Sequence, residues 1–303
     1  MPVISIWNKC NNKCIMCTNN KEYEDTPTDR YCLKEQISKM ERYLKGDINM
    51  YFKGAGDGNY LAFTGGEPTL HPDFIKLVYY FRKRFPEKEM TLLTNGRTFS
   101  NEDFLKKYIA AAGYPARTIM PVHSDNAGEH DYIAGVKGAF EQTIRGLKNL
   151  FKNAPADHAI GIRYIQHGIG NRTRMARTLK FLLENFPDTE RYSLAIIHYE
   201  IEGHSFSNEK DIHISLTDSA AEALAAKPLI DRFKYVYLYH YPMCVLDEGL
   251  RGITRITLPD EERIYPEEKC GHCILREKCL GLMMSYDELF GHNELKEIKK
   301  CTH

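Results

Sequence analysis

The sequence predicts an α/β fold built on a parallel β-sheet. Short apolar segments typical of buried strands alternate with longer amphipathic segments typical of helices. The chain has 303 residues, of which 43% are hydrophobic and 27% charged, the composition of a globular protein with a sizeable core. A strand followed by a helix, repeated along the chain, is typical of a parallel sheet whose crossovers share one hand.

Six segments have the length and flanking residues of buried strands. They are residues 3–7, 60–63, 90–94, 118–122, 160–165 and 193–197. Helices are predicted between and after them at residues 33–44, 73–84, 102–112, 139–152 and 174–185. Asn101 precedes the third of these helices, and Asn171 or Thr173 the fifth, so these residues are candidate N-caps.

The regular alternation of predicted strands and helices ends at about residue 215. One helix at 220–226 and one strand at 234–239 precede a stretch rich in Cys, Pro, Gly and charge at 241–280. This stretch has too little apolar sequence to form its own core, so something else should stabilise it. The sequence therefore predicts a main part at residues 1–215 and a small Cys-rich extension at 216–303.

Charge and hydropathy exclude several classes of function. The 41 basic and 41 acidic residues cancel, which disfavours a nucleic-acid partner. No apolar run reaches about 18 residues, the length that a membrane-spanning helix needs, and no secretory leader is present. We therefore expect a cytoplasmic protein with no membrane partner.

The nine cysteines are unevenly spread. Three lie between residues 10 and 17, four between residues 244 and 279, and none between Cys32 and Cys244. In a chain without a signal peptide, clustered thiols indicate metal binding rather than disulfides.

Cys10, Cys14 and Cys17 form a C-x3-C-x2-C pattern directly after the first predicted strand. Three thiolates on one loop can bind three corners of a cubane iron–sulfur cluster and leave the fourth iron open, as a catalytic centre requires. A structural zinc site and free reduced thiols are the alternatives. Polar and Gly-rich segments follow the next three strands, at 65–68, 95–96 and 123–125. Since parallel strands end at one edge of a sheet, these segments should lie near the thiols.

This order of motifs, with Gly65-Gly66-Glu67-Pro68 following the three cysteines, resembles the radical SAM superfamily. The resemblance implies a partial six-unit (β/α) TIM-like barrel over about residues 3–200. It also implies that the three thiols hold a [4Fe-4S] cluster and that the open iron binds S-adenosylmethionine (SAM). The segment 65–68 would receive the SAM amino group, with Glu67 as its charged partner.

Three further residues resemble superfamily positions that line the SAM site: Asn95, Ser124 and Asn171. Each also has an ordinary structural explanation. Asn95 could belong to a turn with Gly96, Ser124 could be a solvated loop hydroxyl, and Asn171 could cap a helix.

Four thiols of the extension, Cys244, Cys270, Cys273 and Cys279, have spacings that fit a zinc site or a second [4Fe-4S] cluster. Their layout resembles the shortened auxiliary-cluster extensions of peptide and cofactor maturases. If all four bind, the cluster has no open iron and serves structure or electron transfer. If Cys244 does not bind, the cluster could hold substrate.

Cys32 and Cys301 remain outside both groups. Either could donate a hydrogen atom to a substrate radical, as a cysteine does in radical epimerases. The alternative is that both are ordinary reduced thiols.

Within the superfamily, the chain resembles peptide maturases of the His-Xaa-Ser type. The resemblance rests on the segments 93–99 and 241–246, on the pair His130-Asp131, and on the closing Cys-x2-Cys-x5-Cys. A solvated loop would explain His130-Asp131 almost as well. The resemblance implies hydrogen abstraction from a ribosomally made peptide, followed by a cross-link or related modification.

Two kinds of partner follow from that resemblance. A ferredoxin or flavodoxin would reduce the cluster, and a separate protein would deliver the peptide by its leader, because the first strand begins at residue 3. The alternatives are a radical SAM enzyme acting on a small metabolite or tRNA, and a non-catalytic metal-binding module.

Overall fold

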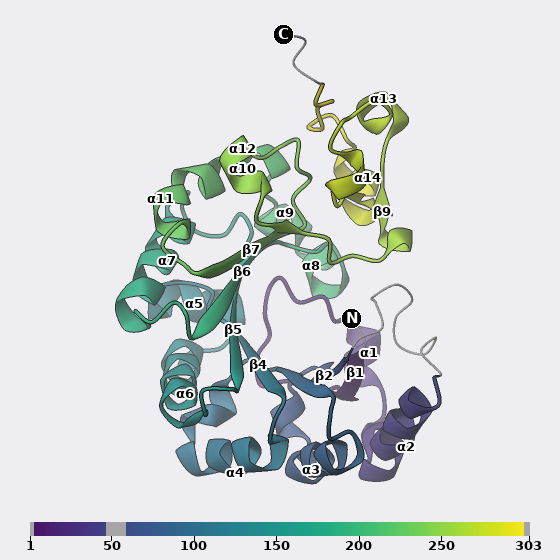
Figure 1. Cartoon of the computed structure of the whole chain (residues 1–303), viewed down its shortest axis with the longest axis vertical. Helices are drawn as coiled ribbons and strands as arrows, with labels where there is room; N and C mark the ends of the chain where they lie inside the picture. The colour runs from purple at the N-terminus through teal and green to yellow at the C-terminus, as the bar shows by residue number, and fades with distance from the viewer. Residues whose placement is uncertain (1–2, 47–58, 300–303) are drawn as a thin grey trace.

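One parallel sheet of eight strands organises the computed structural model, which describes residues 3–46 and 59–299. The strands are β1 (Val3–Trp7), β2 (Tyr60–Gly65), β3 (Glu89–Leu93), β4 (Ala116–Pro121), β5 (Ala159–Gln166), β6 (Tyr192–His198), β7 (Tyr235–Tyr239) and β8 (Thr254–Arg255). Neighbours in the chain are neighbours in the sheet, which curves as an open partial barrel (Figure 1). The predicted α/β fold is confirmed.

The sheet continues two strands beyond the six that were predicted. β7 pairs in parallel with β6, and β8 pairs in parallel with β7. The segment predicted as a strand at 234–239 is therefore the seventh member of the barrel sheet, and the predicted division at residue 215 does not coincide with an edge of the sheet. β8 has only two residues, too few for a pattern in the sequence.

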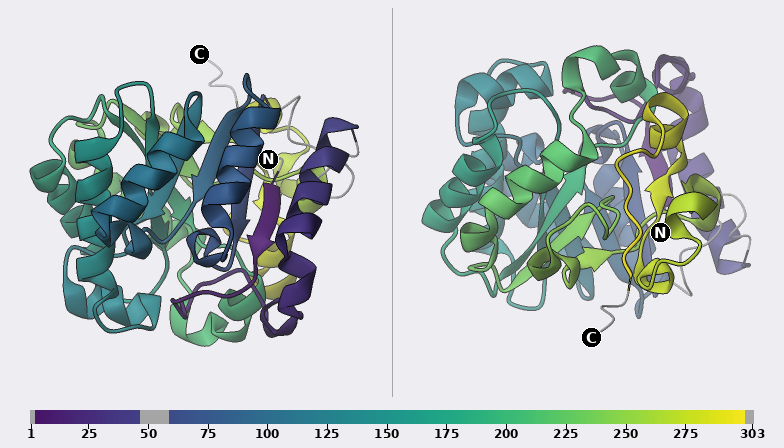
Figure 2. Two further views of the ribbon diagram at one scale, coloured as in Figure 1. Left: turned by 90° about the horizontal axis from the view of Figure 1, so that it is seen from below. Right: turned by 90° about the horizontal axis from the view of Figure 1, so that it is seen from above.

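Five helices cover the outer face of the curved sheet (Figures 1 and 2). They are α2 (Leu33–Leu44), α3 (Phe74–Arg84), α4 (Glu102–Ala112), α6 (Ala139–Asn153) and α7 (Arg174–Asn185), each within one residue of its prediction. α6 shows why they form: it buries Leu147 and Leu150 against the sheet and exposes Lys148. Asn101 caps α4 as predicted, because its side chain accepts a hydrogen bond from the Phe104 amide.

Shorter elements complete the fold, and those at residues 216–230 lie between β6 and β7 and contact α7. The shorter elements are α1 (Lys21–Asp25), α5 (Ala127–Ala134), α8 (Gly203–Ser207), α9 (Glu209–Ile212), α10 (Leu216–Ala225), α11 (Lys227–Ile230), α12 (Glu248–Arg251), α13 (Glu267–Cys270), α14 (Met284–Phe290) and the antiparallel pair β9 (Arg263–Ile264) and β10 (Leu282–Met283). In the C-terminal segment, Tyr286 belongs to a small apolar cluster that also contains Tyr199 and Ile212, which follow β6. The segment is thus anchored on the barrel instead of forming a core of its own.

Among residues 3–46 and 59–299, no helix is both long and apolar enough to cross a bilayer.

Several imidazoles lie inside the fold, and His158 shows what this implies for stability. His158 is 1% exposed, and its Nε2 lies 2.8 Å from the Thr118 hydroxyl. Burial, aided by the nearby Arg191, lowers its pKa to about 4. Between that value and the usual pKa near 6.5, the unfolded chain binds a proton that the folded chain excludes.

We therefore expect the free energy of unfolding to fall as the pH is lowered from about 6.5 to about 4. In His158→Gln, the free energy of unfolding should change less steeply with pH. The difference in slope should be up to about 1.4 kcal/mol per pH unit, the contribution of one excluded proton. Urea titrations at several pH values measure both slopes. Equal slopes in the two proteins would show that His158 does not gain a proton on unfolding.

Candidate active site

A cavity of about 300 Å³ opens at the carboxyl edge of the sheet. Its wall is formed by residues that lie near or after the carboxyl ends of six different strands. Those important for the chemistry are Cys10, Cys14, Cys17, Gly65, Gly66, Asn95, His123, Arg163 and Glu200. The expectation that the three thiols, the glycine pair and Asn95 meet at this edge is confirmed.

The loop that carries the three thiols is held from both sides. The amides of Lys13 and Ile15 donate to carbonyls at the end of α5, at 2.9 and 3.0 Å. On the other side, the Ser205 amide at the start of α8 donates to the Cys17 carbonyl at 2.9 Å. These backbone hydrogen bonds therefore fix the loop whose thiols line the cavity.

The environment of these thiols suits a positively charged metal centre. Burial raises the pKa of Cys10 to about 11, and the nearby Glu67 and Cys17 add to the effect. Burial and the neighbouring thiols also raise the pKa of Cys14, and burial raises that of Cys17. Thiolates in this arrangement are costly without a cation, and bound iron removes that cost. Cys10 Sγ already accepts a hydrogen bond from the Asn12 amide at 3.3 Å, as a ligating sulfur does.

Gly65 and Gly66 are required by the backbone beside them. Gly65 has φ +136, and a Cβ there would lie 2.1 Å from the Trp7 carbonyl oxygen. A Cβ on Gly66 would lie 2.5 Å from the Lys9 carbonyl oxygen, and the Gly66 amide donates to Trp7 at 2.7 Å. The glycines thus let the loop after β2 pack directly on the chain that leads to the thiols.

Glu67 lies behind the cavity wall, not in it. It is 1% exposed, and its Oε1 accepts hydrogen bonds from the Thr69 and Thr94 hydroxyls, both at 2.6 Å. Its Oε2 accepts one from the Asn95 amide at 2.7 Å. The carboxylate therefore fixes the loop after β3, whereas its predicted contact with SAM remains a prediction. Pro68 begins a short 3-10 helix and is buried beside it.

The loop after β3 in turn reaches the cysteine loop. The Asn95 side-chain amide donates to the Asn11 side chain at 2.7 Å and lies 3.8 Å from Cys10 Sγ. Arg97 donates to the Asn12 side chain at 2.8 Å. Arg97 was not among the predicted site residues, although it lies in the same 93–99 segment.

Ser124 points away from the cavity, and its neighbour His123 takes the place expected for it. The Ser124 hydroxyl is buried and donates to Glu129 at 2.6 Å. Glu129 is also bound by Arg177 at 2.9 Å. Pro121 and His123 line the cavity, because alternate residues at the end of β4 face the same side.

The pair His130-Asp131 lies in α5, so the solvated-loop explanation is wrong. His130 is 1% exposed, and its ring centroid lies 4.9 Å from that of His123. The Asp131 carboxylate accepts hydrogen bonds from the amides of Gly138 and Phe140, at 2.6 and 2.8 Å. Asp131 therefore anchors the start of α6.

Two other predicted residues lie off both candidate sites. Asn171 accepts hydrogen bonds from the Thr173 amide and hydroxyl, at 3.0 and 2.6 Å, but the N-cap of α7 is Thr173, the other candidate. Cys32 is exposed at the start of α2 and lines neither thiol cavity. Cys301 lies outside the described residues.

Four charged residues that line the cavity were missed from the sequence: Lys13, Glu24, Arg163 and Glu200. The side chain of Arg163 on β5 makes no hydrogen bond or ion pair with any described residue, and burial lowers the pKa of its guanidinium. Glu200 follows β6, and its Oε1 lies 3.4 Å from His240 Nε2. His240 is the one non-glycine residue with positive φ (+66) in the described chain, and its Nδ1 lies 3.0 Å from the His198 carbonyl oxygen. The cavity therefore offers both signs of charge.

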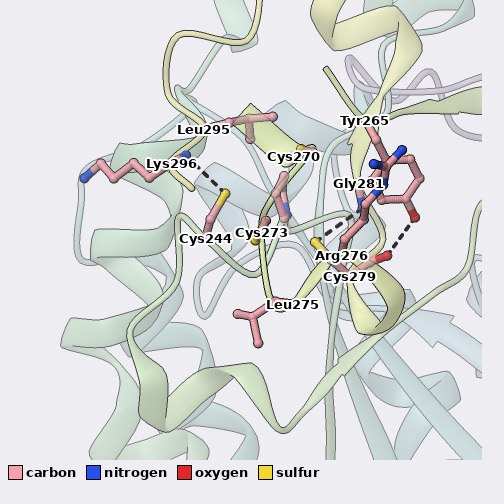
Figure 3. Close-up of a pocket in the computed structure, with 11 residues that line it drawn as sticks. Cys244, Tyr265, Cys270, Cys273, Leu275, Arg276, Cys279, Gly281, Leu295 and Lys296 are labelled. Carbon is pink, nitrogen blue, oxygen red and sulfur yellow. Dashed lines mark hydrogen bonds between the residues drawn. The ribbon is translucent and has the colours of Figure 1, made fainter. Parts of the chain in front are cut away.

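A second, small cavity collects the thiols of the C-terminal segment (Figure 3). Cys244, Cys270, Cys273 and Cys279 all line it, as their spacing predicted. Burial and then the three other thiols raise the pKa of Cys270 to about 11. Within residues 3–46 and 59–299, no group of three or more Cys, His, Asp or Glu side chains is arranged as it stands to hold a single metal ion.

Backbone amides point at two of these four sulfurs. Cys279 Sγ accepts from the amides of Met243 and Gly281, at 3.2 and 3.4 Å. Cys244 Sγ accepts from the Lys296 amide at 3.5 Å (Figure 3). Amide donors of this kind stabilise thiolates and lie around ligating sulfurs in iron–sulfur sites.

Residues 4–169, more than half of the chain, match the family model of the radical SAM superfamily. Among curated proteins, the Fe-coproporphyrin III synthase of Methanosarcina barkeri is 28% identical over 153 residues, which cover 49% of this chain and 33% of that protein. AlbA of Bacillus subtilis, an antilisterial bacteriocin subtilosin biosynthesis protein, is 30% identical over 162 residues, or 52% of this chain and 31% of that protein. The chain thus spans about a third of each relative.

Among solved structures, SuiB of Streptococcus suis is similar with a TM-score of 0.54. The match has 15% sequence identity and covers 78% of this chain and 49% of SuiB. It supports the partial-barrel fold.

Proposed function

The chain belongs to the radical SAM superfamily, and on that premise we propose that it modifies a ribosomally made peptide, with Cys10, Cys14 and Cys17 holding the [4Fe-4S] cluster that the superfamily requires. The observation that supports the cluster site is that all three thiols line one cavity with Gly65 and Gly66. When bound, the cluster and SAM supply a one-electron cleavage that yields methionine and the 5′-deoxyadenosyl radical.

The protein's own residues hold and enclose that chemistry. Three thiolates leave one iron of the cluster without a protein ligand, which is where SAM would bind. Asn95 hydrogen-bonds the cysteine loop, and the buried Glu67 carboxylate holds Asn95 in place. The surrounding barrel wall limits the access of water to a reactive radical. Such an enzyme needs a reductant, and we propose a ferredoxin or flavodoxin.

We further propose that Cys244, Cys270, Cys273 and Cys279 hold a second [4Fe-4S] cluster in the Cys-rich part of the chain that follows β7. The amide bonds to Cys279 and Cys244 support the inclusion of both sulfurs as ligands. With four thiolates, no iron is open to substrate, so the role of this centre is structural or electron transfer.

The charges of the cavity support a peptide substrate. Lys13 and Arg163 face it together with Glu24 and Glu200. A peptide bond offers one acceptor and one donor, so the unpaired donors of Arg163 and the Glu200 carboxylate complement it. The similarity to a protein of subtilosin biosynthesis also favours a peptide, whereas the similarity to a coproporphyrin synthase keeps a small metabolite as the second candidate.

The peptide proposal is tested by measuring the transfer of deuterium from a labelled peptide to 5′-deoxyadenosine. The anaerobic enzyme, dithionite and SAM are mixed with a deuterated peptide encoded beside the enzyme, together with the leader-binding protein that we expect to deliver it. Deuterium should enter 5′-deoxyadenosine, and the peptide should emerge modified. Deuterium transfer from labelled coproporphyrin, with none from the peptide, would favour the second candidate. Arg163→Met should abolish peptide modification while the peptide-independent cleavage of SAM persists.

A further inference from the structure

Glu24 and Glu200 line the cavity beside the thiols, and each carboxylate lies next to a histidine. Glu24 Oε1 lies 3.0 Å from His204 Nε2, and Glu200 Oε1 lies 3.4 Å from His240 Nε2. The two pairs differ in burial, because the His204 side chain is 35% exposed and that of His240 is 3% exposed. Of the two pairs, the second therefore joins a cavity-facing carboxylate to an imidazole that is shielded from solvent.

The orientation of the His240 ring determines what the second pair can do. His240 Nδ1 lies 3.0 Å from the His198 carbonyl oxygen, which can only accept, so this nitrogen carries a proton. In the neutral ring Nε2 then has a lone pair, and this lone pair faces the Glu200 carboxylate. Two acceptors that face each other lack one hydrogen. A proton delivered to Glu200 can therefore be shared with His240 as a charge-assisted hydrogen bond.

The backbone holds both members of the pair in place. His240 has φ +66, a left-handed conformation that is costly for a residue with a Cβ and that persists where the surroundings impose it. The Ser205 hydroxyl donates to the Glu200 carbonyl oxygen at 2.5 Å. The carboxylate and the imidazole are thus held face to face by the chain segments that follow β6 and β7.

The pair also lies where the cavity wall leads toward the second group of thiols. His240 directly follows β7, and Pro242 and Cys244, which come next along the chain, line the cavity of the C-terminal thiols. A proton and an electron that leave the substrate on this side of the cavity would therefore meet neighbouring acceptors.

We infer that Glu200 is the catalytic base that takes a proton from the peptide after hydrogen abstraction, and that His240 is its positioning residue. This inference rests on the proposed function, because it requires a peptide radical. A cross-link removes two hydrogens from the peptide. One leaves as an atom to the 5′-deoxyadenosyl radical, and the resulting carbon radical forms a bond to a second group of the peptide. The hydrogen of that group leaves as a proton to Glu200, and the remaining electron passes to the proposed second [4Fe-4S] cluster in its oxidised form.

The deuterated-peptide assay tests this assignment when deuterium transfer and cross-linked product are measured together. Glu200→Gln keeps the size of the side chain but removes the base. Deuterium should still enter 5′-deoxyadenosine, whereas the product formed per 5′-deoxyadenosine should fall by about a hundredfold, the effect of losing a general base. Glu200→Asp keeps the carboxylate and should retain most of the product. A residue that only shaped the cavity would lower the transfer and the product together.

His240→Asn tests the second member of the pair. Asn is tolerated in the left-handed conformation, so the variant keeps the backbone but loses the imidazole that shares the proton. The product formed per 5′-deoxyadenosine should fall by about tenfold, the effect of losing one hydrogen bond. Deuterium transfer should again persist.

The dependence on pH gives a third measurement. In Glu200→Gln the product per 5′-deoxyadenosine should rise as the pH is raised from about 7 to about 9, because hydroxide can replace the missing base. Arg163, Glu202 and Glu262 are the other charged groups near Glu200. The Arg163 guanidinium stays charged over this range. Burial, with the charges of Glu200 and Glu262, raises the pKa of Glu202 to about 7, so Glu202 must be controlled for.

Glu202→Gln is the matched control, since Glu202 lies two residues after Glu200 but does not line the cavity. Its deuterium transfer and its product should equal those of the wild type. Iron content checks that each variant retains its clusters. Unchanged product in Glu200→Gln would overturn the inference, as would an equal loss in Glu202→Gln. Absence of deuterium transfer in the wild type would refute the proposed function itself, and the inference with it.

Discussion

Replacing Cys10, Cys14 and Cys17 together by Ala should abolish the reductive cleavage of SAM. All three thiols face the same cavity, and no other cysteine within residues 3–46 and 59–299 lines it. Without them the cluster has no protein ligand there, so about four of about eight bound irons should be lost if both proposed clusters form. Iron analysis and the yield of 5′-deoxyadenosine after dithionite reduction measure the two effects.

Cys32→Ala provides the matched control for this experiment. Cys32 is exposed at the start of α2 and lines neither thiol cavity, so its removal should change neither the iron content nor the cleavage of SAM. Retained SAM cleavage in the triple variant would refute the assignment of the catalytic cluster. Loss of cleavage in Cys32→Ala alone would show that the thiol outside the cavity has a role that its position does not explain.

The fold was largely predictable because the barrel strands are buried on both faces. Strands such as β5 and β6 form nearly continuous apolar runs, and the amphipathic helices between them have one clear buried face. β8 could not be predicted, since its two residues carry no periodic pattern. α5 was missed for a related reason: its eight residues bury only His130, Ile133 and Ala134.

The position of the thiols was predictable because chain order determines which strand ends meet. Which side chain faces the cavity was not. At the end of β4, Ser124 was predicted from its resemblance to a superfamily position, and the sequence did not show that His123 is the residue that lines the cavity. Arg163 was missed because a single charged residue within a strand does not reveal whether it faces solvent or an internal cavity.

The direction of Glu67 depends on contacts that are distant in the sequence. Its carboxylate is fixed by Thr94 and Asn95, which come from the next strand end along the sheet. A motif that contains a charged residue beside two glycines predicts that the charge meets the ligand. In the folded chain the glycines line the cavity and the Glu67 carboxylate holds the neighbouring loop, while its contact with SAM stays a prediction.

Cys279→Ala should have the second largest effect, because it removes the most enclosed sulfur of the C-terminal site. Cys279 is 9% exposed, and two amides donate to its sulfur. Losing one of four ligands should release the second cluster, so bound iron should fall from about eight to about four. The cleavage of SAM without peptide should persist, because the first cluster is held by other residues. Peptide modification should stop if the second cluster accepts an electron from the product.

Metal analysis of the same variant also distinguishes iron from zinc. If the wild type contains about four irons and one zinc, and Cys279→Ala loses only the zinc, the second site is a zinc site and the proposed electron transfer is wrong. Cys244→Ala addresses the fourth ligand. Cys244 accepts one amide bond and lies across the cavity from Cys279 (Figure 3), so its removal should cause the same loss of four irons. Full iron content in that variant would mean that three cysteines suffice and that one iron of this cluster is open to substrate.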